Sequence, residues 1–333
     1  MTSLTSAAVL TGTARVELMD LEVGAPGEGE VLIRVSAVGL CGSDAHWYEE
    51  GSIGDADLGR GLVLGHELSG VIESGSRAGE RVAVDPAIPC QVCDLCRRHQ
   101  QNLCGDLKFA GHGTTHGALR GRLVWPERCL TTLPDAMPDE VGALLEPLGV
   151  AIHAVDLADI DASMTVGVVG AGPIGLLIVL VLQQSGVARI VASEPLPHRR
   201  DVAESLGAVV ESGPLGDAAL CDVVFDAAGT DAALASAFEA VRPGGVVVAV
   251  GIPTGDRTTL AASVPRRKEL SLRWCRRMAS GDLDRAASLA ADRIEVLAGL
   301  VTHIYPMEAV VRAFEDLVAR RGVKVVVTPG TSL

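Results

Sequence analysis

The stretch 39–70 holds one thiol, one imidazole and one carboxylate whose types suit metal chemistry. They are Cys41, His66 and Glu67. Thiolate, imidazole and carboxylate form the mixed ligand set of a catalytic zinc, which keeps one position open for water or substrate. Glycines beside Cys41 and His66 permit tight turns that direct these side chains inward. For either residue alone a packed cysteine or a hydrogen-bonded core histidine is the alternative. The presence of all three, with a second metal signature downstream, favours zinc.

The second signature is a run of cysteines with the spacing C-x2-C-x2-C-x7-C. Its members are Cys90, Cys93, Cys96 and Cys104. Four thiolates this close in sequence can complete a tetrahedron around zinc, which leaves no open position and makes such a site structural. Iron–sulfur ligation is the rival interpretation, and unpaired cysteines or two disulfides are the other alternative. We expect a zinc ion that orders its loop and takes no part in the chemistry.

A glycine-rich G-x-G-x-x-G motif lies between an apolar strand, 166–169, and an apolar helix, 174–185. Gly170 permits the turn, Gly172 lets a pyrophosphate approach the backbone, and Gly175 lets the helix and strand pack closely. The N-terminus of the helix supplies N–H groups and a favourable dipole for phosphates. The motif in this context predicts a dinucleotide-binding site.

Glu194 ends the next predicted strand and specifies the dinucleotide. Its carboxylate would accept hydrogen bonds from the adenosine ribose and repel a 2′-phosphate, so the sequence favours NAD over NADP. Arg199 lies nearby and is expected to stack on adenine or to face solvent. The candidate cofactor-binding residues are Gly170, Gly172, Pro173, Ile174, Gly175, Glu194, Arg199 and Val250.

The composition of the 333-residue chain excludes some partners. Its formal net charge of −14 repels phosphate backbones, so no nucleic-acid partner is expected. Four of the eight cysteines lie at metal spacing and the rest are scattered, which indicates a reducing, cytoplasmic compartment. No basic segment precedes an apolar core at the N-terminus, so no signal peptide is expected. The uncharged run 165–182 approaches the length of a membrane span, but its glycines and Pro173 indicate a buried strand and helix and no membrane partner.

Hydrophobic patterning divides the chain into two kinds of structure. The first 150 residues look β-rich, with strand-like segments 31–35 and 82–84 between Gly- and Pro-bearing turns. From residue 166 strands and helices alternate, which predicts an α/β fold with a doubly wound parallel sheet. The expected strands are 166–169, 189–193, 222–227 and 246–250, and the expected helices are 174–185, 197–206 and 231–241. Short strands resume after about residue 292.

The order of these motifs resembles that of zinc-dependent medium-chain alcohol dehydrogenases. More narrowly, the stretches 41–54 and 145–154 are similar to the sorbitol (polyol) dehydrogenase branch, as is Val301-Thr302-His303 with Pro306. The resemblance implies a GroES-like catalytic domain made of residues 1–150 and 292–333, with a Rossmann NAD-binding domain, 151–291, inserted between them. It also implies a homodimer, or a homotetramer of such dimers, in which the strand 246–250 joins two Rossmann sheets.

The resemblance assigns roles to individual residues. Cys41, His66 and Glu67 match the catalytic zinc ligands. Glu146 matches a carboxylate that binds the zinc directly or holds its water, and which of Glu67 and Glu146 is the direct ligand stays open. Ser43 and His46 match the hydroxyl and imidazole of a proton relay. The resemblance places Arg273 near the substrate, and Trp47 and Trp274 are expected to line the substrate pocket with apolar faces.

Three departures from the family pattern stand out. The segments 70–79 and 207–221 are short, and Gln91 replaces the glycine that usually follows the first structural cysteine. None of them removes a motif residue.

The combined prediction is a zinc-dependent oxidoreductase that transfers a hydride from a secondary hydroxyl of a polyol or cyclitol-like substrate to NAD. An amino-cyclitol, a 3-hydroxy amino acid such as threonine, or another secondary alcohol is the alternative substrate. A non-catalytic nucleotide-binding protein or a crystallin-like structural protein is the alternative outside enzymes. The intact set of Cys41, His66 and Glu67 favours an enzyme, because a non-catalytic descendant could lose these ligands and still fold.

Overall fold

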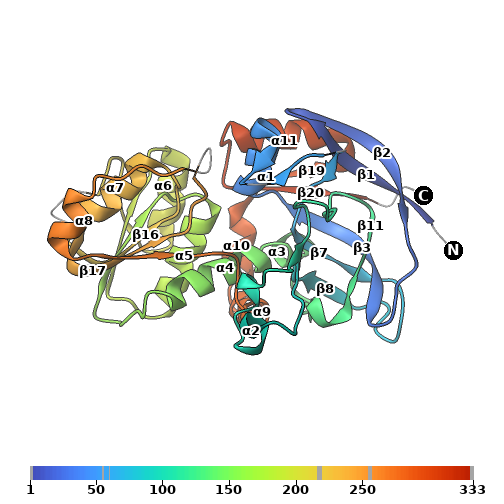
Figure 1. Cartoon of the computed structure of the whole chain (residues 1–333), viewed down its shortest axis with the longest axis horizontal. Helices are drawn as coiled ribbons and strands as arrows, with labels where there is room; N and C mark the ends of the chain where they lie inside the picture. Colours follow the sequence, from blue (N-terminus) through green and yellow to red (C-terminus); the bar gives the residue numbers. More distant parts are fainter. Residues whose placement is uncertain (1–2, 55, 60, 216–219, 254–256, 331–333) are drawn as a thin grey trace. The chain divides into compact units, whose positions relative to one another are not determined.

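The computed structural model describes residues 3–54, 56–59, 61–215, 220–253 and 257–330. The chain forms two compact units, one of Met1–Glu146 and Ala279–Leu333 and the other of Pro147–Met278. The blue strand β1 (Ser3–Gly12) and the red strand β20 (Lys324–Thr328) in Figure 1 therefore belong to the same unit.

The first unit is built mainly from β-strands. Besides β1 and β20, its longer strands are β2 (Arg15–Val23), β3 (Glu30–Gly39), β7 (Glu67–Ile72), β8 (Arg81–Val84), β11 (Arg122–Pro126), β12 (Leu130–Thr132) and β19 (Val301–Pro306). Its two-residue strands are β4 (Ser52–Ile53), β5 (Ala56–Asp57), β6 (Leu62–Val63), β9 (Ala87–Ile88) and β10 (Lys108–Phe109). The main sheet has the order β12-β8-β7-β3-β20-β19, with β11 also paired to β3. Alternate residues of β3, Val31, Ile33 and Val35, are buried, as period-two patterning requires.

Short helices complete the first unit. They are α1 (Gly42–Glu50), α2 (Asp94–Arg97), α3 (Asp139–Gly142), α9 (Asp282–Ala291), α10 (Ile294–Leu300) and α11 (Val310–Val318). Helix α1 is fixed against α11 by a stacked pair, Tyr48 and Phe314, whose ring centroids are 4.9 Å apart. This packing holds the helix that directly follows Cys41.

The second unit contains a six-stranded sheet in which every pair of neighbours is parallel. Its strands are β13 (Thr165–Val169), β14 (Arg189–Ser193), β15 (Val209–Glu211), β16 (Cys221–Asp226), β17 (Val241–Ala249) and β18 (Ser271–Trp274). Its helices are α5 (Pro173–Gln184), α6 (Pro197–Ser205), α7 (Asp231–Ala240) and α8 (Ser263–Lys268); α4 (Leu145–Asp156) starts just before its boundary. The strand order β15-β14-β13-β16-β17-β18 is the 3-2-1-4-5-6 order of dinucleotide-binding sheets, and it confirms the predicted α/β fold class.

The apolar run 165–182 forms β13 and α5, as predicted. Gly172 is the N-cap of α5 and Pro173 occupies its first turn, where a missing N–H costs no helical hydrogen bond. Leu176 to Leu182 are buried along the helix, which explains its continuous hydrophobicity. Across the described part of the chain, no helix combines the length and apolar character that a membrane crossing requires.

The predicted role of the strand 246–250 in joining two sheets is wrong. Strand β17 pairs with β16 on one side and with β18 on the other, so it has no free edge. Among the described residues, the strands that end this sheet are β15 and β18. The short segment 207–221 contains β15. Its residues 216–219 lie outside the described part of the chain.

Candidate active site and metal centres

Two neighbouring strands bring the first three candidate ligands together. Cys41 is the N-cap of α1, just after β3, and Glu67 is the first residue of β7. Strands β3 and β7 are antiparallel, and Gly39 of β3 pairs with Glu67. One ligand atom from each of Cys41, His66 and Glu67 lies within 4.8 Å of the others. The sheet register therefore assembles a thiol, an imidazole and a carboxylate around one point.

Asp44 holds the two loops of this site together. Its side chain is 1% exposed. Its Oδ2 accepts a hydrogen bond from the Cys41 N–H at 2.9 Å, and its Oδ1 accepts one from the Gly65 N–H at 3.3 Å. Oδ1 also lies 3.7 Å from Nδ1 of His66. At this distance the two groups attract each other without a hydrogen bond, and a carboxylate on the Nδ1 side leaves Nε2 available to bind a metal.

Lys324 is a further residue of this site, and no motif in the sequence indicated it. It is the first residue of β20, its side chain is 1% exposed, and its Nζ forms an ion pair with Oε2 of Glu67. Burial alone would lower the pKa of Lys324, but the nearby Glu67 and Cys41 outweigh burial and raise it. A Cβ at Gly39 would overlap the side chains of both Glu67 and Lys324, so any larger residue there would displace this ion pair. The signal in the sequence is a lysine inside the apolar strand Val323-Lys324-Val325.

Glu146 interacts electrostatically with Cys41, His66 and Glu67, but its carboxylate is not among the ligand atoms that lie within 4.8 Å of one another. It is 5% exposed, and burial, together with Glu67 and Cys41, raises the pKa of its carboxyl to about 8 although His66 opposes the shift. Burial, and then Glu67, also raise the pKa of the Cys41 thiol to about 12. Four acidic groups, those of Cys41, Asp44, Glu67 and Glu146, thus lie close together in this site, beside the cation Lys324. This excess of potential negative charge, on a thiol, an imidazole and carboxylates, suits a divalent zinc ion.

The four-cysteine loop has the geometry of a closed site. Cys90 Sγ lies 3.9 Å from Cys96 Sγ, and Cys93 Sγ lies 3.9 Å from Cys104 Sγ. Tetrahedral thiolates about 2.3 Å from one zinc ion would be separated by about 3.8 Å. The eight cysteines form no disulfide within the described part of the chain, so the disulfide alternative does not hold. The geometry fits a single tetrahedral ion.

Backbone geometry explains two features of this loop. The N–H groups of Val92 and Cys93 lower the pKa of Cys90 to about 7, which favours the thiolate that a metal requires. Gln91 has a φ of +64°, in the region that favours glycine. Gln91, which replaces the glycine usual at this position, therefore has a left-handed backbone conformation.

The glycine motif forms the turn between β13 and α5. Gly170 has a φ of +90°, and a Cβ at Gly175 would overlap the carbonyl oxygen of Gly170. Both glycines are thus required by the backbone. Gly172 caps α5, and an ideal Cβ there would lie 3.4 Å from Nη1 of Arg199. Pro173 and Ile174 begin the helix whose N-terminus faces this turn.

Glu194 closes the turn from the next strand. It is 4% exposed; its Oε2 accepts a hydrogen bond from the Ala171 N–H at 2.8 Å, and its Oε1 accepts one from the Leu196 N–H at 2.9 Å. Arg200 donates from Nη1 to the carbonyl oxygens of Glu194, at 3.1 Å, and Pro195, at 2.6 Å. A buried carboxylate is therefore anchored beside the predicted phosphate-binding turn. Val250 follows β17, and its N–H donates to the carbonyl of Asp226 at 2.8 Å.

The predicted relay residues both lie on α1. Ser43 is in its first turn, and His46 Nδ1 lies 2.7 Å from Oε1 of Glu50, one helical turn further on. This contact orients the His46 imidazole, and Glu50 was not identified from the sequence.

The three predicted substrate residues fall in different units. Trp47 belongs to the first unit, is 1% exposed, and meets His112 edge-on with ring centroids 5.7 Å apart. Arg273 and Trp274 belong to the second unit. Arg273 pairs with Asp159 at 3.0 Å and contacts the Leu157 carbonyl, and Trp274 is 56% exposed.

Comparison with known proteins assigns the family. Residues 27–135 match the alcohol dehydrogenase GroES-like domain, and residues 173–292 match the zinc-binding dehydrogenase domain. D-xylulose reductase A of Aspergillus niger is 34% identical in an alignment of 343 positions, which covers 96% of this chain and 95% of that protein. The chain belongs to the zinc-dependent medium-chain alcohol dehydrogenase family.

Solved structures agree with this assignment. L-idonate 5-dehydrogenase of Escherichia coli K-12 has a TM-score of 0.91 and 28% identity, and the match covers 98% of this chain and 99% of that one. 2R,3R-butanediol dehydrogenase of Bacillus subtilis has a TM-score of 0.84 and 26% identity, covering 98% of this chain and 100% of that one. The predicted family, its sorbitol dehydrogenase-like branch, the GroES-like and Rossmann fold and the enzyme class are confirmed.

Proposed function

We propose that this protein oxidises a secondary hydroxyl of a polyol, or reduces the corresponding ketone, with zinc and NAD as cofactors. The observation that carries the proposal is the grouping of Cys41, His66 and Glu67 within 4.8 Å, next to buried Glu146. The compared proteins are named for D-xylulose, L-idonate and 2R,3R-butanediol, each of which carries a secondary alcohol or ketone beside another oxygen. A carboxylate-containing zinc sphere suits such oxygen-rich substrates.

Each site residue has a proposed task. A bound zinc ion would lower the pKa of a coordinated hydroxyl, and NAD would accept the hydride from its carbon. Cys41, His66 and Glu67 would hold the metal, while Glu146 would bind it directly or hold its water. Ser43 would receive the hydroxyl proton and His46 would pass it on, with Glu50 holding the imidazole. Because catalysis of this kind depends on placement, the rigid sheet that carries the ligands supports the proposal.

The cofactor assignments rest on separate features. Glu194 stands at the phosphate-binding turn and would bind the ribose and repel a 2′-phosphate, so we assign NAD. Cys90, Cys93, Cys96 and Cys104 would hold a second, structural zinc, as their sulfur spacing supports. Trp47, Arg273 and Trp274 remain proposed substrate contacts, and Val250 and Arg199 remain proposed cofactor contacts.

Assembly and compartment are also proposals. We assign a homodimer or a homotetramer, the closed symmetric states common in soluble enzymes. The eight cysteines, none of which forms a disulfide in the described residues, support a reducing compartment such as the cytoplasm. Light scattering tests the assembly, and a monomer at micromolar concentration would refute it.

Initial rates over a substrate panel test the proposed function. The panel contains sorbitol, xylitol, threitol, inositols, threonine and simple secondary alcohols, each with NAD and with NADP. The expected result is that a polyol with NAD gives the highest kcat/KM. If simple alcohols surpass every polyol, the substrate assignment fails; if threonine does, the chain is a hydroxy amino acid dehydrogenase.

A further inference from the structure

Glu146 differs from the other members of the active site in how it is held. Cys41, His66 and Glu67 lie at the ends of β3 and β7, so the register of the sheet fixes them. Glu146 instead lies in the first turn of α4, which follows α3 after a short connection. Its distance from the other ligands therefore depends on how the α3 segment is attached to the sheet.

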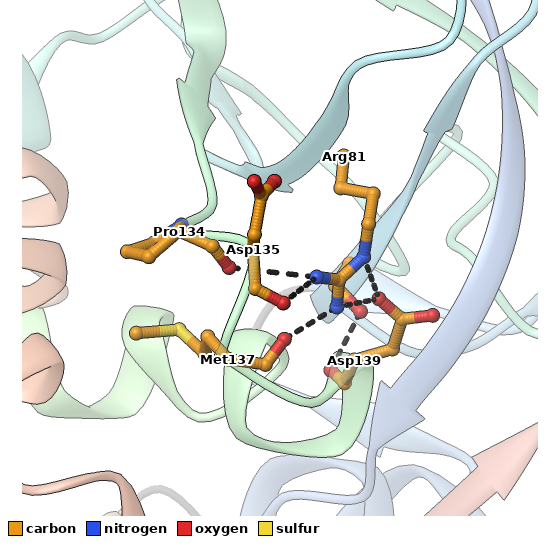
Figure 2. A network of polar contacts seen from close by, with 6 residues as sticks. Arg81, Pro134, Asp135, Met137 and Asp139 are labelled. Atoms are coloured by element: carbon orange, nitrogen blue, oxygen red, sulfur yellow. Dashed lines mark hydrogen bonds and ion pairs between the residues drawn. The ribbon is translucent and has the colours of Figure 1, made fainter.

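Arg81 makes the first attachment, shown in Figure 2. It lies on β8, where it pairs with Val71 of β7, in the sheet that carries Glu67. Its Nε and Nη2 donate to Oδ1 of Asp139, at 3.0 and 2.6 Å. Its guanidinium also donates to three backbone carbonyls of the turn before α3, those of Pro134 at 3.4 Å, Asp135 at 3.3 Å and Met137 at 2.5 Å. Because the planar guanidinium of Arg81 donates to one carboxylate and three carbonyls at the same time, it fixes the position and the orientation of this turn.

Ser69 makes the second attachment, from inside the protein. It is 0% exposed and lies two residues after Glu67 on β7, so both side chains leave the same face of the strand. Its hydroxyl donates to the carbonyl of Asp139 at 2.7 Å. A Cβ at Gly142, the last residue of α3, would come within 3.0 Å of Ser69 Cβ. Both ends of α3 therefore rest on the strand that carries Glu67.

We infer that Arg81 and Ser69 are positioning residues that set the Glu146 carboxylate relative to Cys41, His66 and Glu67. The inference rests on the proposed function, because it assigns Glu146 to the metal site. Arg81 and Ser69 act on Glu146 indirectly, through their hydrogen bonds to Asp139 at the start of α3. Both residues belong to the sheet that also carries Glu67. The four groups of the site thus share one rigid frame, which a site with an open coordination position requires.

Arg77 provides the matched control. The exposure of its side chain, 26%, is close to the 28% of Arg81. It pairs with Glu80 at 2.8 Å within the β7–β8 connection and donates to Thr132 of β12 at 2.9 Å. Its contacts within the described residues, with Glu80, Glu127 and Thr132, do not reach the turn before α3. Loss of Arg77 should remove its ion pair with Glu80 at the surface and leave the position of Glu146 unchanged.

The test uses the full-length enzyme with the four-cysteine site loaded with zinc and the other site loaded with Co²⁺. Arg81→Ala and Ser69→Ala are each expected to change the visible d–d spectrum of the cobalt and to lower kcat/KM for xylitol by about 10- to 100-fold, the usual effect of losing a support of a metal site. Arg81→Lys keeps the positive charge but loses the planar, bidentate guanidinium, so its kcat/KM should lie between those of wild type and Arg81→Ala. Arg77→Ala should leave the spectrum unchanged.

A double-mutant cycle decides whether the effect acts through Glu146. Adding Arg81→Ala to Glu146→Gln should lower kcat/KM by less than about twofold. If Arg81 acts through Glu146, the Glu146→Gln variant has already lost the effect that Arg81→Ala removes. An unchanged cobalt spectrum in both Arg81→Ala and Ser69→Ala, or equal losses with and without Glu146, would overturn the inference. Should Arg81→Ala fail to fold, Ser69→Ala, which removes one hydroxyl, takes its place in the cycle. If Glu146→Gln itself leaves both spectrum and activity unchanged, the assignment of Glu146 under the proposed function fails instead.

Discussion

Lys324 and Glu67 form an ion pair in which both side chains are 1% exposed. A buried pair of this kind is costly to form and still more costly to break, because removal of one partner leaves an unpaired charge in the interior. Glu67 is also a candidate metal ligand, so its carboxylate has two cations to balance, the lysine and the proposed zinc. The stability of the first unit should therefore depend on both.

Lys324→Met should destabilise the metal-free protein by about 3 to 5 kcal/mol, the cost of leaving one partner of a buried pair. Zinc at Cys41, His66 and Glu67 would supply the missing positive charge, so the loss should be smaller in the zinc-loaded protein. Urea unfolding with and without zinc at this site measures the difference. The double variant Lys324→Met, Glu67→Gln serves as the control, since it removes both charges. An equal loss in both metal states would contradict the argument.

The metal-free active site should lose stability as the pH rises. Burial raises the pKa of Glu146 in the folded protein to about 8 from 4.5, and it raises the pKa of Asp44 as well. A carboxyl with a raised pKa holds its proton more tightly when folded, so its stabilising contribution is complete below 4.5 and is lost as the pH rises through 8.

Calorimetry of the protein without its catalytic zinc, between pH 5 and 8.5, measures this trend. The melting temperature should fall with pH, and less steeply in Glu146→Gln, whose side chain does not ionise. Zinc binding should oppose the trend, because it favours the ionised carboxylates. The same slope in wild type and Glu146→Gln would show that Glu146 does not titrate in this range.

The two metal sites should respond differently to loss of a thiol. Cys93→Ser should lower the melting temperature and the yield of folded protein, because a closed thiolate site contributes to folding. Cys41→Ser should abolish turnover and leave a folded protein. Elemental analysis should find two zinc ions per wild-type chain and one in Cys41→Ser. Iron with absorbance in the visible range would instead support the iron–sulfur alternative.

The sequence predicted the ligand groups because their spacing reflects local geometry. Cys41 and His66 stand next to glycines that turn the chain, and the close spacing of Cys90 and Cys93 lets one loop enclose an ion. The apolar run around Gly170 was predicted correctly as a strand and a helix. Elements that are buried on all sides consist almost entirely of apolar residues, and this run does so on both sides of the glycine turn. Local chemistry and local structure were thus both available in the sequence.

Contacts between distant segments were not predictable in this way. Lys324 meets Glu67 only after β20 is added to the sheet beside β3. Arg81 binds mainly backbone carbonyls, which leave no mark in the side-chain pattern. The error about the sheet edge arose because β18 is only four residues long and contains Arg273 and an exposed Trp274, so it lacks the apolar run of a buried strand.

His46→Ala should slow turnover by about 10- to 100-fold at neutral pH, the contribution of a positioned acid–base group. The deficit should shrink at high pH, where hydroxide can take the proton. Glu50→Gln should give a smaller deficit, because it weakens the contact that orients His46. Glu49→Gln changes the charge by the same amount one residue away and is the control. Deficits in His46→Ala that do not depend on pH would argue against a relay.

Glu194→Ser should change the dinucleotide preference. The Glu194 carboxylate is held in place by the N–H groups of Ala171 and Leu196, so it presents a fixed negative charge beside the turn. Arg200 is engaged with the carbonyls of Glu194 and Pro195, which leaves its Nη1 occupied in the free protein. Loss of the carboxylate removes both the ribose acceptor and the repulsion of a 2′-phosphate.

The KM for NAD should rise about tenfold or more, as expected from the loss of hydrogen bonds to a charged group, and the KM for NADP should fall. Steady-state rates with both dinucleotides measure the two changes. Glu204→Ser, on the exposed side of α6, makes the same change in net charge away from the turn and should leave both KM values as they are. If wild type prefers NADP, or if Glu204→Ser shifts the preference as much as Glu194→Ser, the selection does not come from the Glu194 carboxylate.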